Sequence, residues 1–252
     1  MCLITFAWQQ ADCPLVLVAN RDEFFARPSQ PAHWWQDRPG VYAGRDLRAG
    51  GSWLGVSRSG RIAALTNVRD PRSNRSDAQS RGQLVADFLA GDLAPGAYAQ
   101  QVLRDGERYN GFNLLLADRN AMVYVGNRQS TVRSLQPGVF ALSNAALDTP
   151  WPKTLSARRK LEAWLARSHP FDELPGLLQD RSLADDDRLP STGVAHALEK
   201  ALSAEFIEMP DYGTRSSTAL RVDRAGRLEF VERGYQPESF DVTMTLDSFW
   251  PD

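Results

Sequence analysis

The chain has 252 residues, of which 42% are hydrophobic and 24% are charged, a composition typical of a globular protein. Its 29 lysines and arginines against 31 aspartates and glutamates leave a net charge of -2, which excludes recruitment to nucleic acid or anionic lipid by bulk charge. The start of the chain lacks a secretory signal and no stretch approaches the ~20 apolar residues that cross a bilayer, so we expect one cytoplasmic domain over residues 1–252, with no nucleic-acid partner and no integral membrane segment.

The first half of the sequence predicts short strands followed by two helices. Apolar runs bounded by Gly, Ser and Asp indicate strands. Ser80 is a suitable N-cap for a helix whose apolar face includes Leu84 and Phe88, and a second helix is predicted over about residues 95–103. The strands predicted before these helices are 3–8, 15–19, 52–57 and 62–66.

The second half repeats this alternation of strand groups and helices. A helix over about 153–167 carries Ala157, Leu161, Trp164 and Leu165 as its core stripe. A shorter helix is predicted over 194–202, after an exposed acidic loop. The remaining predicted strands are 113–117, 122–125, 139–142, 216–222, 228–233 and 242–246. Helices that come in pairs between strand groups favour antiparallel sheets covered by helices over a Rossmann alternation.

Cys2 is the first candidate catalytic residue. A small residue after Met1 is what methionine aminopeptidase normally needs, and removal of Met1 would leave a thiol and an α-amine on one residue. An α-amine titrates near ~7.7 to 8.0, so it can accept the thiol proton near neutral pH. For an arbitrary cysteine, a small buried residue at the start of a strand is the better interpretation. The position directly after Met1 favours catalysis instead.

The polar run Asn20-Arg21-Asp22-Glu23 ends an apolar strand that can pair with the first strand and bring this run near Cys2. Side chains alternate across a strand, so Arg21 and Glu23 are expected on one face and Asn20 and Asp22 on the other. Taken alone, this tetrapeptide would be interpreted as a solvated hairpin turn.

The order of several motifs along the chain changes that interpretation. Together these motifs resemble the NRDE family, whose best-known member is the Transport and Golgi organisation protein 2. The resemblance covers nearly the whole chain. The motifs are Cys2, Asn20-Arg21-Asp22-Glu23, Gly51-Ser52-Trp53-Leu54-Gly55 with Gly60, Leu65-Thr66-Asn67, Ser143-Asn144 and Tyr212-Gly213-Thr214-Arg215-Ser216-Ser217-Thr218.

This family in turn is similar to the cysteine N-terminal nucleophile hydrolases, such as penicillin V acylases and bile salt hydrolases. The resemblance implies an α+β fold with four αββα layers, in which two antiparallel sheets pack between helices. It also implies a set of catalytic residues around the nucleophile. Arg21 and Asp22 match an Arg and an Asp of the acylases by type, but they are adjacent here and separated there, so Glu23 is an alternative to Asp22.

Three further residues are implied as catalytic by the same resemblance. Asn144 resembles the acylase Asn that stabilises the oxyanion, Asn67 is a second donor candidate, and Arg215 resembles the distal Arg near the nucleophile. Without the resemblance, each would be interpreted as a turn Asn or a surface Arg. The expected ligand-binding residues are Asn20, Glu23, Ser52 and Trp53.

Two functions are favoured at this point over a third, a pseudoenzyme that retains the scaffold and acts through protein contacts. The first is hydrolysis or acyl transfer at an amide or acyl carbon through Cys2, which needs no cofactor. The second is a carrier for haem or a fatty acyl-CoA, in which Cys2 could ligate haem iron and Arg21 or Arg215 could pair with carboxylates or phosphates. Both predict a small amphipathic ligand or acyl substrate. The isolated histidines predict no metal site.

Overall fold

The computed structural model describes residues 2–10, 13–167 and 170–251, and its strands form two antiparallel sheets. The first sheet has six strands in the order β10-β1-β2-β11-β12-β13, and every neighbouring pair is antiparallel. The longest strands, β2 and β11, lie side by side at its centre. Their bounds are β1 Cys2–Gln10, β2 Cys13–Phe24, β10 Gly138–Leu142, β11 Tyr212–Val222, β12 Leu228–Gly234 and β13 Phe240–Leu246.

The second sheet has seven strands in sequence order from β3 to β9, all antiparallel. Sequence neighbours therefore pair throughout this sheet, whereas the first sheet joins strands from both ends of the chain. The bounds are β3 Ser29–Trp34, β4 Val41–Asp46, β5 Leu54–Ser57, β6 Ile62–Asn67, β7 Phe112–Ala117, β8 Met122–Gly126 and β9 Thr131–Ser134.

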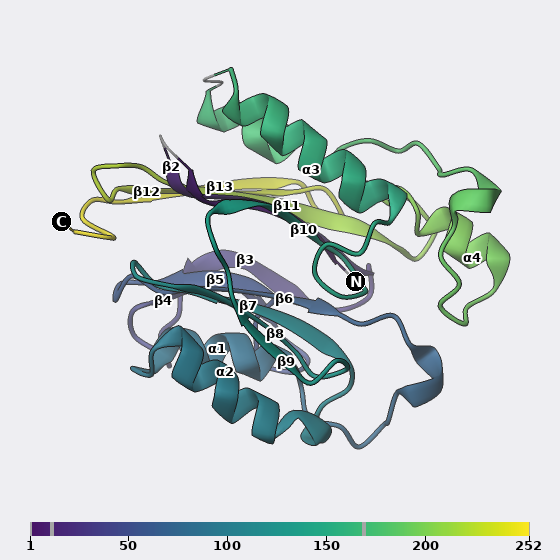
Figure 1. Cartoon of the computed structure of the whole chain (residues 1–252), viewed down its shortest axis with the longest axis horizontal. Helices are drawn as coiled ribbons and strands as arrows, with labels where there is room; N and C mark the ends of the chain where they lie inside the picture. The colour runs from purple at the N-terminus through teal and green to yellow at the C-terminus, as the bar shows by residue number, and fades with distance from the viewer. Residues whose placement is uncertain (1, 11–12, 168–169, 252) are drawn as a thin grey trace.

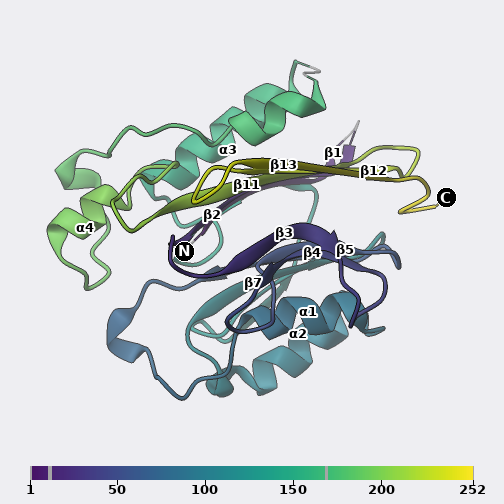
Figure 2. The same ribbon diagram turned by 180° about the vertical axis from the view of Figure 1, so that it is seen from behind.

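Helices cover the outer faces of the two sheets (Figures 1 and 2). Helices α1 and α2 pack on the second sheet, and the longest helix, α3, packs on the first. This arrangement confirms the predicted four-layer αββα sandwich. No helix in the described part of the chain is long and apolar enough to cross a membrane. The helix bounds are α1 Gly82–Ala90, α2 Pro95–Arg104, α3 Pro152–Leu165 and α4 His196–Ala201, with short 3-10 segments at Pro71–Ser73, Gly106–Arg108, Phe171–Gly176 and Asp186–Arg188.

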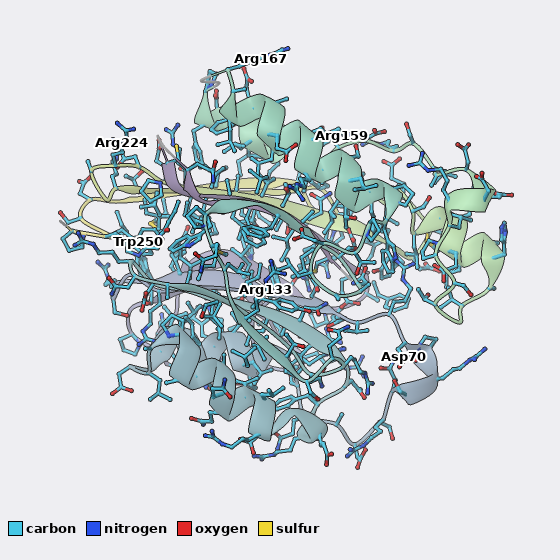
Figure 3. The ribbon with its side chains drawn as sticks, in the orientation of Figure 1. Asp70, Arg133, Arg159, Arg167, Arg224 and Trp250 are labelled. Atoms are coloured by element: carbon cyan, nitrogen blue, oxygen red, sulfur yellow. The ribbon has the colours of Figure 1, made fainter. Side chains whose placement is uncertain are left out.

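The main hydrophobic core lies between the two sheets, where side chains fill the space (Figure 3), and it is built by the alternation of residues along the strands. On β1, Ile4, Phe6 and Trp8 face the second sheet, whereas Leu3 and Ala7 face α3. Such a two-sided strand needs apolar residues at nearly every position, which explains its continuous apolar run. The described C-terminal segment closes one edge of this core. Its residues Phe249 and Trp250 are buried there.

Most predicted elements are confirmed, with differences of a few residues at their ends. Three strands that the sequence analysis did not predict are present: β3, β4 and β9. Strand β3 contains Pro31 and an irregular register between Gln30 and His33, and β9 is a short, partly exposed strand, so neither shows clear alternation. In β4 the expected pattern is interrupted by Gly44.

The prediction that Ser80 caps the first helix is wrong. Helix α1 begins at Gly82, Arg81 occupies the N-cap position, and no side chain forms a capping hydrogen bond there. The carbonyl of Ser80 instead accepts a hydrogen bond from the backbone N–H of Gln83, with 3.2 Å between the two atoms. Arg81 is thereby placed at the start of the helix.

Phe230 tests the packing between the sheets. This side chain is 2% exposed, and its ring meets the edge of Tyr42 from the other sheet at a centroid distance of 5.2 Å. We expect Phe230→Ala to lower the free energy of unfolding by about 3–5 kcal/mol, measured by urea denaturation. Phe24→Ala is the matched control, because that ring is 58% exposed, and it should change stability by less than about 1 kcal/mol. Equal losses for both variants would contradict the proposed role of Phe230.

Candidate active site

The pairing of β1 with β2 brings Cys2 directly opposite Arg21. The sequence analysis placed the polar run 20–23 after the second strand, but this placement is wrong because β2 extends to Phe24 and includes all four residues. Ile4 and Ala19 belong to the core between the sheets. Side chains two residues apart on a strand lie on the same face, so Cys2, Arg21 and Glu23 also face the space between the sheets. The alternation predicted for this run is confirmed.

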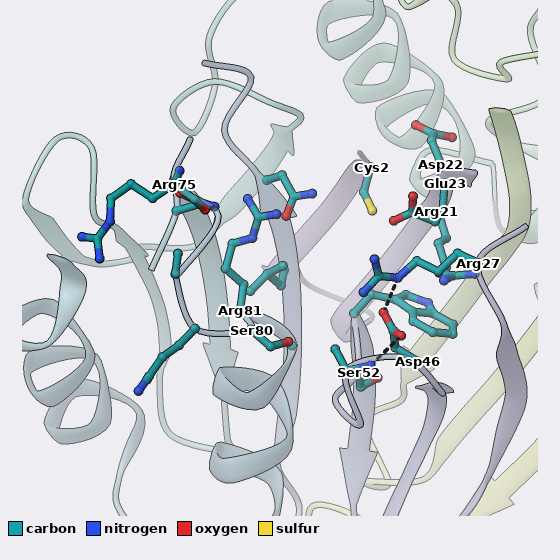
Figure 4. Close-up of a pocket in the computed structure, with 18 of the residues that line it drawn as sticks. Cys2, Arg21, Asp22, Glu23, Arg27, Asp46, Ser52, Arg75, Ser80 and Arg81 are labelled. Carbon is teal, nitrogen blue, oxygen red and sulfur yellow. Dashed lines mark hydrogen bonds and ion pairs between the residues drawn. The ribbon is translucent and has the colours of Figure 1, made fainter. Parts of the chain in front are cut away.

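A cavity of about 320 Å³ opens at this end of the space between the sheets (Figure 4). Its walls come from β1, β2, the segment before β5, the end of β6 and the loop that leads into α1. Charged and polar side chains form most of the lining. The residues of this cavity that the sequence predicted for the site are Cys2, Arg21, Asp22, Glu23, Ser52, Trp53 and Asn67.

Arg21 is held in the cavity wall by an aromatic ring and a hydroxyl. Its guanidinium carbon lies 4.0 Å from the centre of the Trp53 ring, and its Nη1 donates a hydrogen bond of 3.1 Å to Ser29 Oγ. On strand β4, Gly44 makes room for this indole, since a Cβ at Gly44 would lie 2.3 Å from Trp53 Cζ2. Gly44 therefore allows the position of the Trp53 ring against which the Arg21 guanidinium packs.

The Cys2 thiol is subject to opposing effects. Burial is the largest and raises its pKa, and the negative charge of Asp22 acts in the same direction. The backbone N–H of Asp22 and the Arg21 guanidinium lower the pKa by stabilising the thiolate. The net pKa is raised, so Cys2 needs a base to take its proton at neutral pH.

The two candidate oxyanion donors lie at different depths. Asn67 ends β6 and lines the cavity, and among the described residues its side-chain amide forms no hydrogen bond. Asn144 is buried behind it and donates from Nδ2 to the Asn67 carbonyl oxygen at 2.9 Å. Ser143 Oγ also donates to the Cys2 carbonyl oxygen, at 3.2 Å. Asn67 can thus face a substrate, while Asn144 and Ser143 hold the backbones of Asn67 and Cys2.

Asp22 borders the cavity, but its carboxylate is buried with polar groups on the α3 side of β2. Its Oδ1 accepts a hydrogen bond of 2.7 Å from Thr214 Oγ1. Burial raises the pKa of the Asp22 carboxyl, and the charge of Lys153 opposes this shift. Lys153 is itself buried at the start of α3, which lowers its pKa to about 8, and its Nζ donates to the Leu202 carbonyl oxygen. Asp22 therefore lies within a buried charged layer behind Cys2.

Two predicted site residues lie away from the cavity lining. Asn20 is buried on the α3 side of β2, where it donates to the carbonyl oxygens of Leu178 and Glu205 and accepts a hydrogen bond from Ser217 Oγ. Two of these bonds tie the segments at Leu178 and Glu205 to β2, and the third joins β2 to β11. Asn20 therefore has structural contacts on the face opposite Cys2.

Arg215 borders a second cavity, of about 270 Å³, on the other side of Trp53. Its guanidinium donates to the backbone carbonyl oxygens of Phe24, Arg27 and Gln236. Arg21 and Trp53 line both cavities. Arg215 thus holds the chain after β2 in place, and it lines the second cavity rather than the one that holds Cys2.

The sequence analysis did not find several charged residues of the first cavity. Arg27 forms an ion pair of 2.7 Å with Asp46, and Arg81 reaches the cavity from the start of α1. These residues lie at strand ends and in loops, where no periodic pattern identifies them. Among the described residues, no group of three or more His, Cys, Asp or Glu side chains is placed to hold a metal ion.

Comparison with solved structures finds similar chains of low sequence identity. The C2A mutant of conjugated bile acid hydrolase from Clostridium perfringens gives a TM-score of 0.49 at 10% identity, covering 98% of this chain and 92% of that chain. The Caenorhabditis elegans orthologue of N-acylethanolamine-hydrolyzing acid amidase gives 0.45 at 11% identity, covering 87% and 92%. The αββα assignment rests on the sheets and helices of this chain.

Sequence comparisons give a more specific result. The Transport and Golgi organisation protein 2 homolog of Bos taurus is 38% identical over 96% of this chain and 97% of its own length. The homolog of Homo sapiens is 35% identical over 92% of both chains. The family model described as Transport and Golgi organisation 2 matches residues 1–237. The resemblance found in the motifs is confirmed, and the chain belongs to the Transport and Golgi organisation 2 family.

Proposed function

We propose that the protein is a hydrolase or acyltransferase that acts on an amide or other acyl carbon through Cys2. The observation that carries this proposal is the position of Cys2, which opens β1 on the face between the sheets, in a cavity it shares with Arg21 and Asn67. A nucleophile, a cation and an amide with free donors in one cavity are the groups that acyl transfer requires.

The chemistry follows from these groups. The Cys2 sulfur attacks the carbonyl carbon of the substrate, and the thiol proton passes to the α-amine that Cys2 carries once Met1 is removed. The Asn67 amide donates to the oxyanion. The carbon–nitrogen bond then breaks, the leaving amine takes the proton, and water or a second amine cleaves the thioester to restore the thiol. Arg21 favours the thiolate, and Asn144 positions Asn67.

A carrier for a hydrophobic anion is the second candidate, since arginines contribute to the cavity. The lining fits haem poorly, because ligand sites for such large flat groups need mainly apolar walls and only a few side chains here are apolar. We therefore derive no step through haem. An acyl-CoA carrier would need the same cations but not the Cys2 thiolate.

The role of Cys2 can be tested by acylation with p-nitrophenyl octanoate followed by intact mass measurement. We expect one hydroxylamine-sensitive acyl group on the wild type and none on Cys2→Ala, with Cys13→Ala as the matched control that keeps the adduct. Because burial raises the pKa of the thiol, the adduct should form faster as the pH rises above neutral. An adduct that persists in Cys2→Ala would remove Cys2 from the mechanism.

The oxyanion assignment predicts different effects for the two asparagines. Asn67→Ala removes a donor to the charge that develops, so deacylation should slow by about 10²–10³-fold with little change in stability. Asn144→Ala removes a buried hydrogen bond, so it should lower the free energy of unfolding by about 1–3 kcal/mol as well as the rate. Single-turnover hydrolysis and urea denaturation measure the two effects. An unchanged rate for Asn67→Ala would refute its role.

The proposed base depends on the N-terminus, and Met1 lies outside the described residues. We expect the intact mass of protein purified from cells to show loss of Met1. Retained Met1, in cells whose aminopeptidase is not saturated, would exclude the free α-amine as the base. That result would favour the carrier.

A further inference from the structure

A row of polar side chains crosses the inner face of the first sheet. The strand registers place Cys2 on β1 opposite Arg21 on β2, and Arg21 opposite Ser216 on β11. Glu232 on β12 continues this row, since Ser216 Oγ donates a hydrogen bond of 3.0 Å to its Oε1. The row therefore begins at the proposed nucleophile and ends at a carboxylate that the proposed mechanism does not use.

Glu232 is buried in the space between the sheets. The residue is 1% exposed, and it lies on the same face of β12 as Phe230, a member of the main core. Burial raises the pKa of the Glu232 carboxyl, whereas its two hydrogen bonds and the charge of Arg21 oppose this shift. Because a buried carboxylate is costly unless it is hydrogen-bonded, its partners indicate what it does in the fold.

The second partner of Glu232 belongs to the other sheet. The backbone N–H of Ala32 on β3 donates a hydrogen bond of 2.7 Å to Glu232 Oε2. The pairing of β3 with β4 is irregular between Gln30 and His33, so Ala32 has no register partner on β4. Glu232 therefore accepts a backbone hydrogen that the strand ladder does not take, and it joins the first sheet to the edge strand of the second.

Strand β3 also carries the hydroxyl group that contacts Arg21. Ser29 Oγ, which accepts the 3.1 Å hydrogen bond from Arg21 Nη1, lies three residues before Ala32 on this strand. Arg21 forms no ion pair among the described residues, so its position depends on the Trp53 ring and on Ser29. Anything that fixes β3 against the first sheet therefore also fixes the Arg21 guanidinium.

We propose that Glu232 is a positioning residue, which holds Ser216 and β3 around Arg21 and so keeps the guanidinium beside the Cys2 thiol. Arg21 and Glu232 both line the second cavity, which gives the guanidinium room to move away from Cys2 if this support is lost. The Arg21 charge lowers the pKa of the thiol, so such a movement would leave less thiolate. This inference rests on the proposed function only for the role of Cys2 as the nucleophile.

The test measures alkylation of Cys2 by iodoacetamide at pH 7.5, followed by intact mass, in protein that carries Cys13→Ala. This reaction needs the thiolate but no turnover. We expect Glu232→Ala to slow alkylation about threefold or more, and Arg21→Gln to slow it at least as much. Because Glu232 acts through Arg21, Glu232→Ala should cause no further loss in protein that already carries Arg21→Gln.

Two controls separate positioning from a general loss of stability. Glu232→Gln can keep both contacts, because its amide oxygen can accept from Ala32 and its amide nitrogen can donate to Ser216 Oγ. Phe230→Leu is the matched control for packing, since it changes a buried side chain on the same face of β12. Both variants should retain the wild-type alkylation rate within about twofold.

The outcomes also separate this inference from the proposed function. An unchanged rate in Glu232→Ala, or an equal loss in Glu232→Gln, would overturn the role of the hydrogen bonds. A further loss from Glu232→Ala in the Arg21→Gln protein would overturn the action through Arg21. If Glu232→Ala does not fold, Ser29→Ala takes its place with the same expected dependence on Arg21. An effect of Glu232→Ala on alkylation, together with no acyl group on wild-type Cys2, would reject the hydrolase and keep the positioning role.

Discussion

The pairing of Cys2 with Arg21 across two neighbouring strands is the contact on which the site depends. Backbone hydrogen bonds between β1 and β2 set this register, and the apolar residues of both strands enforce it, because a slip of one residue would move every core side chain to the other face. The burial of Ile4, Phe6 and Leu17 thus fixes the position of a polar pair at the strand ends. The stability of the sandwich and the geometry of the site have the same origin.

The same alternation separates the polar run of β2 into two environments. Arg21 and Glu23 face the space between the sheets, whereas Asn20 and Asp22 form hydrogen bonds on the α3 side, and Asp22 also borders the cavity. Four consecutive polar residues in a central strand are tolerated because each face offers partners. Arg21 and Glu23 line the cavity. Asn20 and Asp22 form hydrogen bonds with β11 and with the segments that precede it.

Much of the fold could be predicted from the sequence, since the continuous apolar runs of β1 and β2 and the helical stripe of Ala157 and Leu161 are direct consequences of burial. Pro31 and Gly44 break the patterns of β3 and β4, and β9 is short and partly exposed, so these three strands escaped prediction. For the site, the cluster around Cys2 was predictable through motifs. Arg81 was not predictable, because its position depends on the close contact between Gly51 and Gly82. These two glycines lie far apart in the sequence.

The indole of Trp53 is a common wall of two cavities, and Gly44 and Arg21 hold it from either side. The two volumes therefore share a wall, so a change of the side chain at position 53 alters the shape of both cavities together.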